Sequence, residues 1–293
     1  MAVYGRSYRR YTGAMTPAWS RFLIFPRYAY ETVFKSKLFV GFYALCFLLP
    51  FVGLLLIYLH HNMTALSFLD LPAEELKKFL PIDNNFFYIG TWFQGALSFL
   101  LVLLVGPALV SPDLRNNGLA LYLSRPFSRS EYVLGKMSVL LILLSAITWL
   151  PSMLLYFFQA YLDGGAWFAN HLRLGFAIFV GSWVWILFLS ILTLAVSAWV
   201  KWRPVARIAL IVIFFVSMGF AGIIAEILHT WAGSLVSPWF VIGSIWTNLF
   251  NIPLGNDGDV LPPPAAAWAA LIGGGLFCLW LLSRRIRAYE VVR

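Results

Sequence analysis

Six apolar runs, each long enough to cross a lipid bilayer, recur along the 293 residues of this chain. A transmembrane helix needs roughly 20 apolar residues to cross a hydrocarbon core of about 30 Å. The runs that meet this requirement cover residues 38–59, 87–110, 138–161, 174–199, 207–230 and 266–283. Because the backbone polar groups of a segment in lipid must bond one another, each run is predicted to form a helix. The sequence therefore predicts an all-α integral membrane protein with six transmembrane helices.

Composition and charge exclude two broad classes. The chain is 61% hydrophobic and 11% charged, whereas soluble globular proteins average about 45–50% apolar and about 25% charged residues. The basic residues behind the net charge of +9 recur in short segments between the apolar runs and form no single patch. Neither a soluble domain nor a nucleic-acid-binding protein is indicated.

The distribution of Lys and Arg predicts the orientation. Eighteen of the 21 such residues fall in the leader, in the segment after the second run, in the link around Lys201 and in the tail. Only Lys77, Lys78 and Arg173 fall on the other side. Because cytoplasmic loops are enriched in Lys and Arg, both termini are predicted to be cytoplasmic in a multi-pass cell-membrane protein, expected in a bacterial inner membrane.

The chain divides into a cytoplasmic leader (1–37), a transmembrane domain (38–283) and a basic cytoplasmic tail (284–293). Within the leader, Arg27, Glu31 and Lys35 share one face opposite apolar residues, which is typical of an amphipathic interfacial helix, with a break expected near Pro26. Such an elbow helix either couples the cytoplasmic face to the first span or merely anchors the chain.

The outer segment between the last two runs contains an aromatic piece, Trp239 to Phe250, that is too short to span a bilayer. We expect a helix that lies at the outer interface or re-enters the bilayer against the fifth and sixth spans.

Sequence motifs for catalysis are missing. Gly135-Lys136 is not part of a GxxxxGK[ST] loop, and neither HExxH nor GxSxG occurs. Cys46 and Cys278 lie inside apolar runs and are predicted to be buried hydrophobic residues. The histidines fall at the predicted outer edges, where interfacial polar residues are favoured over half a metal site: His60, His61, His171 and His229. Neither catalytic nor metal-binding residues are predicted.

Hydroxyl residues inside the spans have two interpretations. Those on one face of the fourth run are Ser182, Ser190, Thr193 and Ser197, and those in the third run are Ser145, Thr148 and Ser152. Such stripes usually pack helix against helix, and the alternative is that Ser190 and Thr193 line a transport pathway.

The fifth run carries an ionisable residue. Phe215, Gly219, Gly222 and Glu226 follow i, i+4, i+7, i+11 spacing, and His229 lies one turn beyond. An acidic residue within a span is costly unless it faces protein or water, so Glu226 and His229 are candidates for a pathway. The alternative is that Glu226 reaches the outer headgroups.

The polar segment 111–136, SPDLRNNGLALYLSRPFSRSEYVLGK, interrupts the middle of the chain and is predicted to be cytoplasmic. Ser128 or Ser130 can cap a helix that runs from about Arg129 into the third span, with Glu131 in its first turn. A stiff cap of this kind transmits movement of a bound partner into the span. The alternative is an ordinary basic loop.

The spaced residues of this segment are Asp113, Gly118-Leu119, Tyr122-Leu123-Ser124-Arg125-Pro126, Ser128-Arg129, Glu131-Tyr132 and Gly135-Lys136. This pattern, placed after the second of six spans, resembles the permease subunits of type-two ATP-binding-cassette exporters. The pattern departs from many of them at Asn116-Asn117, where they have charged residues.

The resemblance implies a permease that pairs as a homodimer or heterodimer over two copies of a separate ATPase subunit. ATP and Mg would be bound by that partner, so this chain would hold no cofactor and would not itself be an enzyme. A coupling helix would dock on the ATPase through Ser124, Arg125, Pro126, Ser128, Arg129, Glu131 and Lys136. Lys201 and Arg203 would make a second contact, and the outer aromatic piece would be a re-entrant hairpin.

Two other function classes stay open at this point. An intramembrane enzyme requires a catalytic pair at membrane depth, for which Glu226 with His229 is the nearest candidate. A membrane scaffold that transports nothing requires no pathway.

Overall fold

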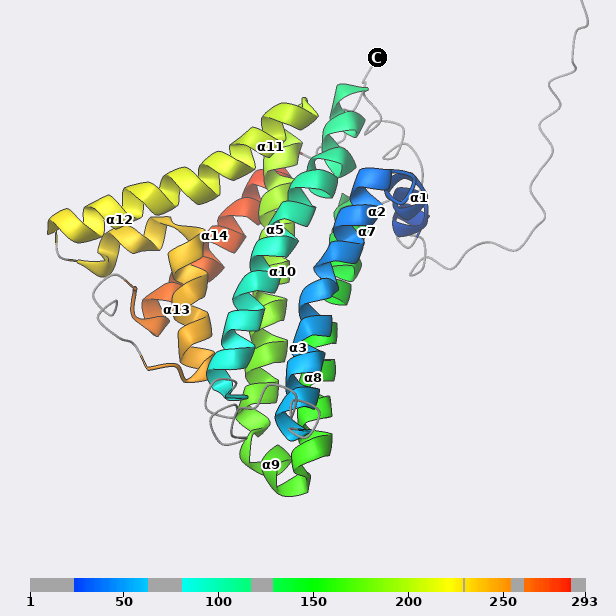
Figure 1. The fold of residues 1–293 in the computed structure, drawn as a ribbon. Coiled ribbons are helices and arrows are strands. Elements are labelled where there is room, and N and C mark those ends of the chain that lie inside the picture. The colour runs from blue at the N-terminus through cyan, green and yellow to red at the C-terminus, as the bar shows by residue number, and fades with distance from the viewer. Residues whose placement is uncertain (1–23, 63–80, 117–128, 229, 254–260, 286–293) are drawn as a thin grey trace, which may run out of the picture.

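The computed structural model describes residues 24–62, 81–116, 129–228, 230–253 and 261–285, and every regular element in these ranges is helical. Six helical units within them are long and apolar enough to cross a membrane (Figure 1). The prediction of an all-α protein with six membrane-length helices is confirmed.

Several of the six units are composed of more than one helix. The units are α2 (Lys37–Cys46) with α3 (Leu48–His61), α5 (Asn84–Arg115), α7 (Arg129–Ile147) with α8 (Trp149–Asp163), α10 (Leu172–Trp199), α11 (Arg203–Ile211) with the π-helix η3 (Val212–Val216) and α12 (Ser217–Leu228), and α14 (Pro264–Arg285). The shorter elements are α1 (Ile24–Val33), α9 (Gly165–Asn170), the 3-10 helix η4 (Trp231–Val236) and α13 (Pro238–Phe250).

Prolines explain the two interruptions in the first and third units. The breaks fall at Phe47 and Thr148, three residues before Pro50 and Pro151. A proline has no N–H, so the carbonyl four residues earlier loses its helical donor and the helix bends or breaks there. The chain continues in nearly the same direction on the far side of each break (Figure 1).

The helix α10 forms the centre of the bundle. It packs against α5, α7, α13 and α14, and its buried residues lie on all sides. A Cβ atom added at Gly106 of α5 would overlap the Thr193 methyl group, so glycine allows the two backbones to approach closely. Ser182, Ser190 and Ser197 are also buried, and this placement favours helix packing as their role.

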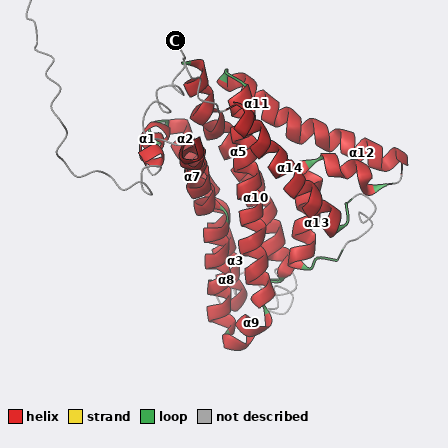
Figure 2. Cartoon of the chain, turned by 180° about the vertical axis from the view of Figure 1, so that it is seen from behind, coloured by secondary structure: helices red, strands yellow, loops and turns green. Residues whose placement is uncertain are grey.

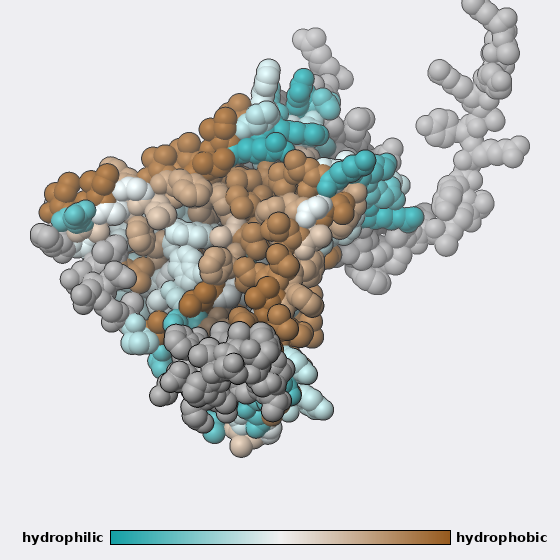
Figure 3. All heavy atoms as spheres, viewed as in Figure 1, coloured by the Kyte–Doolittle hydropathy of each residue, from teal (hydrophilic) through white to brown (hydrophobic). Residues whose placement is uncertain are grey.

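The two ends of the bundle differ in charge. The starts of α2, α7 and α11 and the ends of α5, α10 and α14 meet at one end, which we call the basic end (Figure 2). Its described cations include Lys37, Arg115, Arg129, Lys201, Arg203, Arg284 and Arg285. Hydrophilic side chains gather over this end, whereas the flank of the bundle is mainly hydrophobic (Figure 3).

The fifth unit lies obliquely. From its start at the basic end, the helix runs across the axis of the other units and ends beside the bundle (Figures 1 and 2). The chain then returns through η4 and descends in α13. Large apolar side chains of η3 and α12 face away from the protein, among them Phe215 (61% exposed) and Ile227 (69% exposed). The predicted run 207–230 is thus an apolar helix, but it does not run parallel to α5, α8 and α10 (Figure 1).

Two short elements bear on local expectations from the sequence. The aromatic piece forms α13, which contacts α12 and α14 of the fifth and sixth units as expected. It also packs on α10, where Trp246 enters the bundle and donates Nε1–H to the Gly181 carbonyl at 3.0 Å. Pro26 lies in the first described turn of α1, where a proline needs no amide hydrogen. The residues before Ile24 fall outside the described ranges, so the break expected near Pro26 stays a prediction.

Arg207 of α11 binds α5 where a proline has removed a hydrogen bond. Its Nε donates to the Leu103 carbonyl at 2.9 Å, and its Nη2 donates to the Leu104 carbonyl at 3.4 Å. Leu103 lies four residues before Pro107, so its carbonyl has no helical donor. The guanidinium therefore satisfies an acceptor that the helix itself leaves open, and it ties the fifth unit to the second.

Replacing Arg207 with Met should lower the free energy of unfolding by about 1–3 kcal/mol, since bonds from a charged donor to carbonyls are lost. In a Pro107→Ala background the same replacement should cost less, because residue 107 then supplies its own N–H to Leu103. Thermal melting of the four proteins in detergent measures this double-mutant cycle. Strictly additive losses would contradict the assignment.

Candidate functional site

The polar segment predicted to dock a partner begins and ends at a bonded cluster. Near the end of α5, the Asp113 Oδ2 atom lies 2.9 Å from Lys136 Nζ and accepts a hydrogen bond from the Tyr132 hydroxyl at 2.8 Å. Tyr132 is fully buried, and the Lys136 and Asp113 side chains are 12% and 17% exposed. We call Asp113, Tyr132 and Lys136 the basic-end junction. It holds together the two helices between which the segment runs.

The helix α1 also belongs to this cluster. The ammonium of Lys136 lies 5.4 Å from the Phe25 ring centroid, and Phe25 meets Tyr132 edge-on at 5.7 Å. The Tyr30 hydroxyl donates to the Val139 carbonyl of α7 at 3.3 Å. Burial, with a smaller contribution from Tyr43, raises the pKa of Tyr30 to about 12, so this hydroxyl remains a donor.

The apolar side of α1 is therefore occupied by the third unit. Its predicted polar stripe, Arg27, Glu31 and Lys35, is exposed. Both features agree with an amphipathic helix whose buried side faces protein at the basic end.

The structure describes three of the predicted docking residues. Arg129 opens α7 and is exposed, and Glu131 lies half-buried in the first turn, as expected for this helix start. Lys136 faces Asp113 and belongs to the junction. The predicted docking residues outside the described ranges are Ser124, Arg125, Pro126 and Ser128.

The second predicted contact lies at the same end. Lys201 is exposed in the short link between α10 and α11, and Arg203 is exposed at the start of α11. Between them, the ring of Trp202 lies under the Arg115 guanidinium, at 5.6 Å from the ring centroid. The link thus contacts the last turn of α5, close in sequence to the junction.

The candidate pathway residues lie apart from one another. Thr193 is buried and donates its hydroxyl to the Leu189 carbonyl at 2.7 Å, and the buried Ser190 lies in the same packed helix. Glu226 is exposed near the end of α12. His229 falls outside the described residues.

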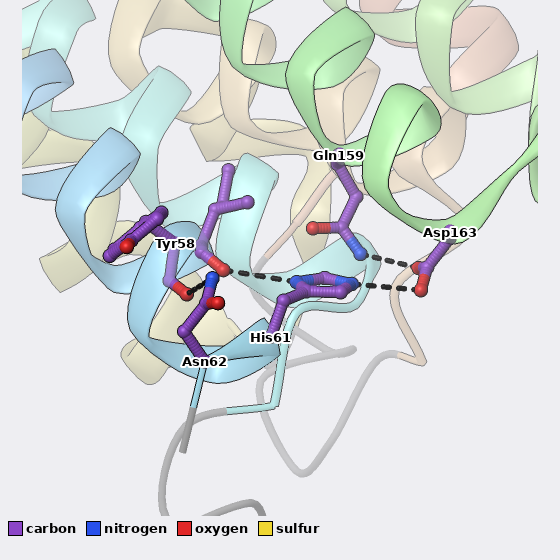
Figure 4. A network of polar contacts seen from close by, with 6 residues as sticks. Tyr58, His61, Asn62, Gln159 and Asp163 are labelled. Carbon is purple, nitrogen blue, oxygen red and sulfur yellow. Dashed lines mark hydrogen bonds and ion pairs between the residues drawn. The ribbon is translucent and has the colours of Figure 1, made fainter. Parts of the chain in front are cut away.

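A second polar cluster lies at the opposite end of the bundle (Figure 4). His61 Nε2 is 2.8 Å from Asp163 Oδ1, and its Nδ1 is 3.0 Å from the Ile57 carbonyl. Gln159 donates to the other Asp163 oxygen at 2.6 Å. Each ring nitrogen of His61 thus faces an oxygen atom of a neighbouring group. This cluster joins α3 to α8.

Within the described ranges, no three His, Cys, Asp or Glu side chains come together in a way that could hold a metal ion. His61 pairs with Asp163. The interpretation of the histidines as interfacial polar residues stays a prediction.

Sequence reasoning missed a cluster of tryptophans in the bundle. Trp92, Trp185, Trp239 and Trp246 come from α5, α10 and α13, with neighbouring ring centroids 5.0 to 5.9 Å apart. The glycines that make room for Trp246 were a possible signal: a Cβ at Gly95 or Gly181 would crowd its ring. The periodicity of one sequence does not show which residues of different helices come together.

A second missed contact crosses the bundle. Gln94 of α5 accepts a hydrogen bond from the Ser152 hydroxyl of α8 at 2.6 Å, and both side chains are buried. The lone amide in an apolar run was the available signal, since a polar side chain in a span needs a partner.

No protein-family model matches this chain, and no curated protein matches it either.

Replacing Asp113 with Ala should lower the free energy of unfolding by about 1–3 kcal/mol, because a largely buried ammonium and a buried hydroxyl lose their acceptor. Asp113→Asn retains an acceptor for Tyr132 and should lose less. Glu31→Ala removes an exposed carboxylate from α1 and serves as the control. Thermal melting compares the three variants, and an Asp113→Ala protein as stable as the control would show that the junction does not hold the helices.

Proposed function

We propose that this chain is the transmembrane permease subunit of an ATP-binding-cassette exporter. Two such chains pair in the membrane, and two copies of a separate ATPase subunit bind at the basic end. By the Lys/Arg bias this end faces the cytoplasm of a cell membrane, with both termini on that side. The ATPase binds ATP and Mg, and this chain supplies the docking surface and the substrate pathway.

The basic-end junction is the observation that carries the proposal. Asp113, Tyr132 and Lys136 are three of the residues on which the resemblance rests, and they bond one another. In the proposal, Ser124 to Glu131 form the coupling helix that contacts the ATPase. Because the junction ties the flanking parts of α5 and α7 together, a push on this segment moves both helices.

Two further contacts extend this coupling. The packing of Phe25 and Tyr30 on α7 connects α1, the proposed elbow helix, to the same movement. The link with Lys201 and Arg203 supplies the second ATPase contact, and Arg207 connects α11 to α5 one turn further on. Docking at the segment from Ser124 to Glu131 and at the link around Lys201 therefore acts on the second, third and fifth units.

The oblique fifth unit supports pairing of two permease chains. The stripe of Phe215, Gly219 and Glu226 is exposed on the single chain. In the proposal a second chain faces this stripe, and Glu226 then lines a pathway shared by the two. The helix α13 is the proposed re-entrant element near the exit.

The docking surface is tested by purifying the tagged chain from its native membrane and identifying an ATP-hydrolysing subunit bound to it. Replacing both Arg125 and Arg129 with Glu should lower the amount of bound ATPase about tenfold or more, since two attractive charges become repulsive. Quantitative mass spectrometry of the purified complexes measures the loss.

A matched control makes the same charge change elsewhere at the basic end. Lys37 and Arg284 are exposed at the start of α2 and the end of α14, and their replacement with Glu should leave the ATPase bound. Equal binding by both double variants would contradict docking through the segment. A chain that shows catalytic turnover of its own, with no ATPase bound, would favour an intramembrane enzyme.

The pathway assignment is tested at Glu226. Glu226→Gln should lower ATP turnover of the reconstituted complex several-fold while expression is unchanged, because a charge within a span contributes where it meets water or substrate. Glu31→Gln makes the same change on the exposed face of α1 and should have no effect. Turnover equal to the parent protein would remove Glu226 from the pathway.

A further inference from the structure

An apolar groove of about 710 Å³ lies on the flank of the bundle, below the oblique fifth unit. Its walls come from α10, α14, η3, η4 and the start of α13, and include Leu192, Trp199, Ile213, Leu235 and Gly274. Small-molecule sites typically measure about 300–1,000 Å³, so the groove can hold a ligand of substantial size.

The length of the groove matches one leaflet of a bilayer. Along α14 its wall extends from Ala270 to Leu281, which is about 16 Å at the rise of an α-helix. Half of a hydrocarbon core of about 30 Å is about 15 Å deep, and because α14 is inclined to the bundle axis (Figure 1), this wall covers most of that depth. Trp199 and Leu281 mark the end of the groove nearer the basic end of the bundle.

One cation lies at that mouth, and a second is close to it in the sequence. The Arg285 guanidinium lies 5.6 Å from the ring centroid of Trp199, whose Nε1 donates to the Leu281 carbonyl at 3.4 Å. Lys201 follows Trp199 by two residues and is exposed. Neither Lys201 nor Arg285 forms an ion pair with another residue that the structure describes.

We propose that the groove binds one acyl chain of an anionic phospholipid from the leaflet at the basic end, with the lipid phosphate between Arg285 and Lys201. Basic residues at a membrane surface attract anionic lipid, and a tryptophan at the mouth fits the interfacial zone. The lipid fills the space between the oblique fifth unit and α14. This inference does not depend on the proposed transport function.

Protein segments suit the groove less well. An extended peptide would bring backbone N–H and C=O groups against apolar walls, which costs free energy unless they are paired. A helix pairs its own backbone, but at a diameter of about 10 Å it would occupy more than about 1,000 Å³ over this length, which exceeds the groove. An acyl chain is slender and carries no polar groups.

The charge at the mouth is tested by native mass spectrometry of the full-length chain, released from vesicles that contain phosphatidylglycerol and phosphatidylcholine. The parent protein should retain phosphatidylglycerol preferentially. Replacing Arg285 and Lys201 with Gln should weaken its retention about tenfold. Replacing Arg27 and Lys37 with Gln removes two exposed cations away from the groove and should change retention little.

The apolar part is tested with adjacent glycines of α14. Gly274 lines the groove, and a Cβ there would make an ordinary contact with the Phe188 ring at 3.5 Å. Gly273 is not among the lining residues, and a Cβ there would meet no atom within 4 Å. Gly274→Leu should therefore displace the retained lipid, and Gly273→Leu should not. If Gly274→Leu does not fold, the comparison between the two pairs of Gln replacements still tests whether the lipid binds at this mouth.

Three results would overturn the proposal. The first is equal retention of the two lipids by the parent protein, and the second is equal retention by the two leucine variants. The third is a change of oligomeric state with Gly274→Leu at unchanged lipid retention, which would assign the groove to a second copy of the chain.

Discussion

The structure depends on one constraint: a backbone carbonyl in lipid has no water to bond, so every acceptor that a proline leaves open needs another solution. The chain uses two. At Pro50 and Pro151 the helix is interrupted and then continues. At Pro107 the helix is unbroken, and the Arg207 guanidinium of the fifth unit bonds the carbonyl that the missing amide leaves free. A local defect in one helix thereby becomes a contact between two.

Polar bonds at both ends and aromatic packing between them hold the remaining units together. Asp113 joins α7 to α5 at the basic end, and Asp163 joins α3 to α8 at the other. Around Trp246, neighbouring rings and close glycines pack α13 into the bundle. The ionic contacts lie near the ends of the bundle, and their side chains are partly exposed, which lowers the cost of burying charge. In the proposed exporter, movement at the basic end would pass along these packed helices.

The membrane-length helices were predictable because each depends on local composition alone. A helix that continues from Arg129 into the third unit was also predictable, since first-turn signals such as Glu131 lie within a few residues. The placement of α13 on α10 was not, because it depends on Gly181 and Trp246, which are 65 residues apart. The oblique course of α12 was missed for a similar reason. An apolar run records the solvent that a helix prefers and carries no information about its angle.

The sequence by itself determined the number of membrane-length helices, the concentration of positive charge at one end and the polar segment between the second and third units. These follow from the free energy of placing each side chain in lipid or water, which is a property of local composition. The tertiary structure alone decided that Lys136 faces Asp113, and that Arg207 bonds the carbonyl that Pro107 leaves without a donor. It also decided that an apolar groove opens beside α14. Those features depend on contacts between distant segments, and such contacts exist only once the helices have packed.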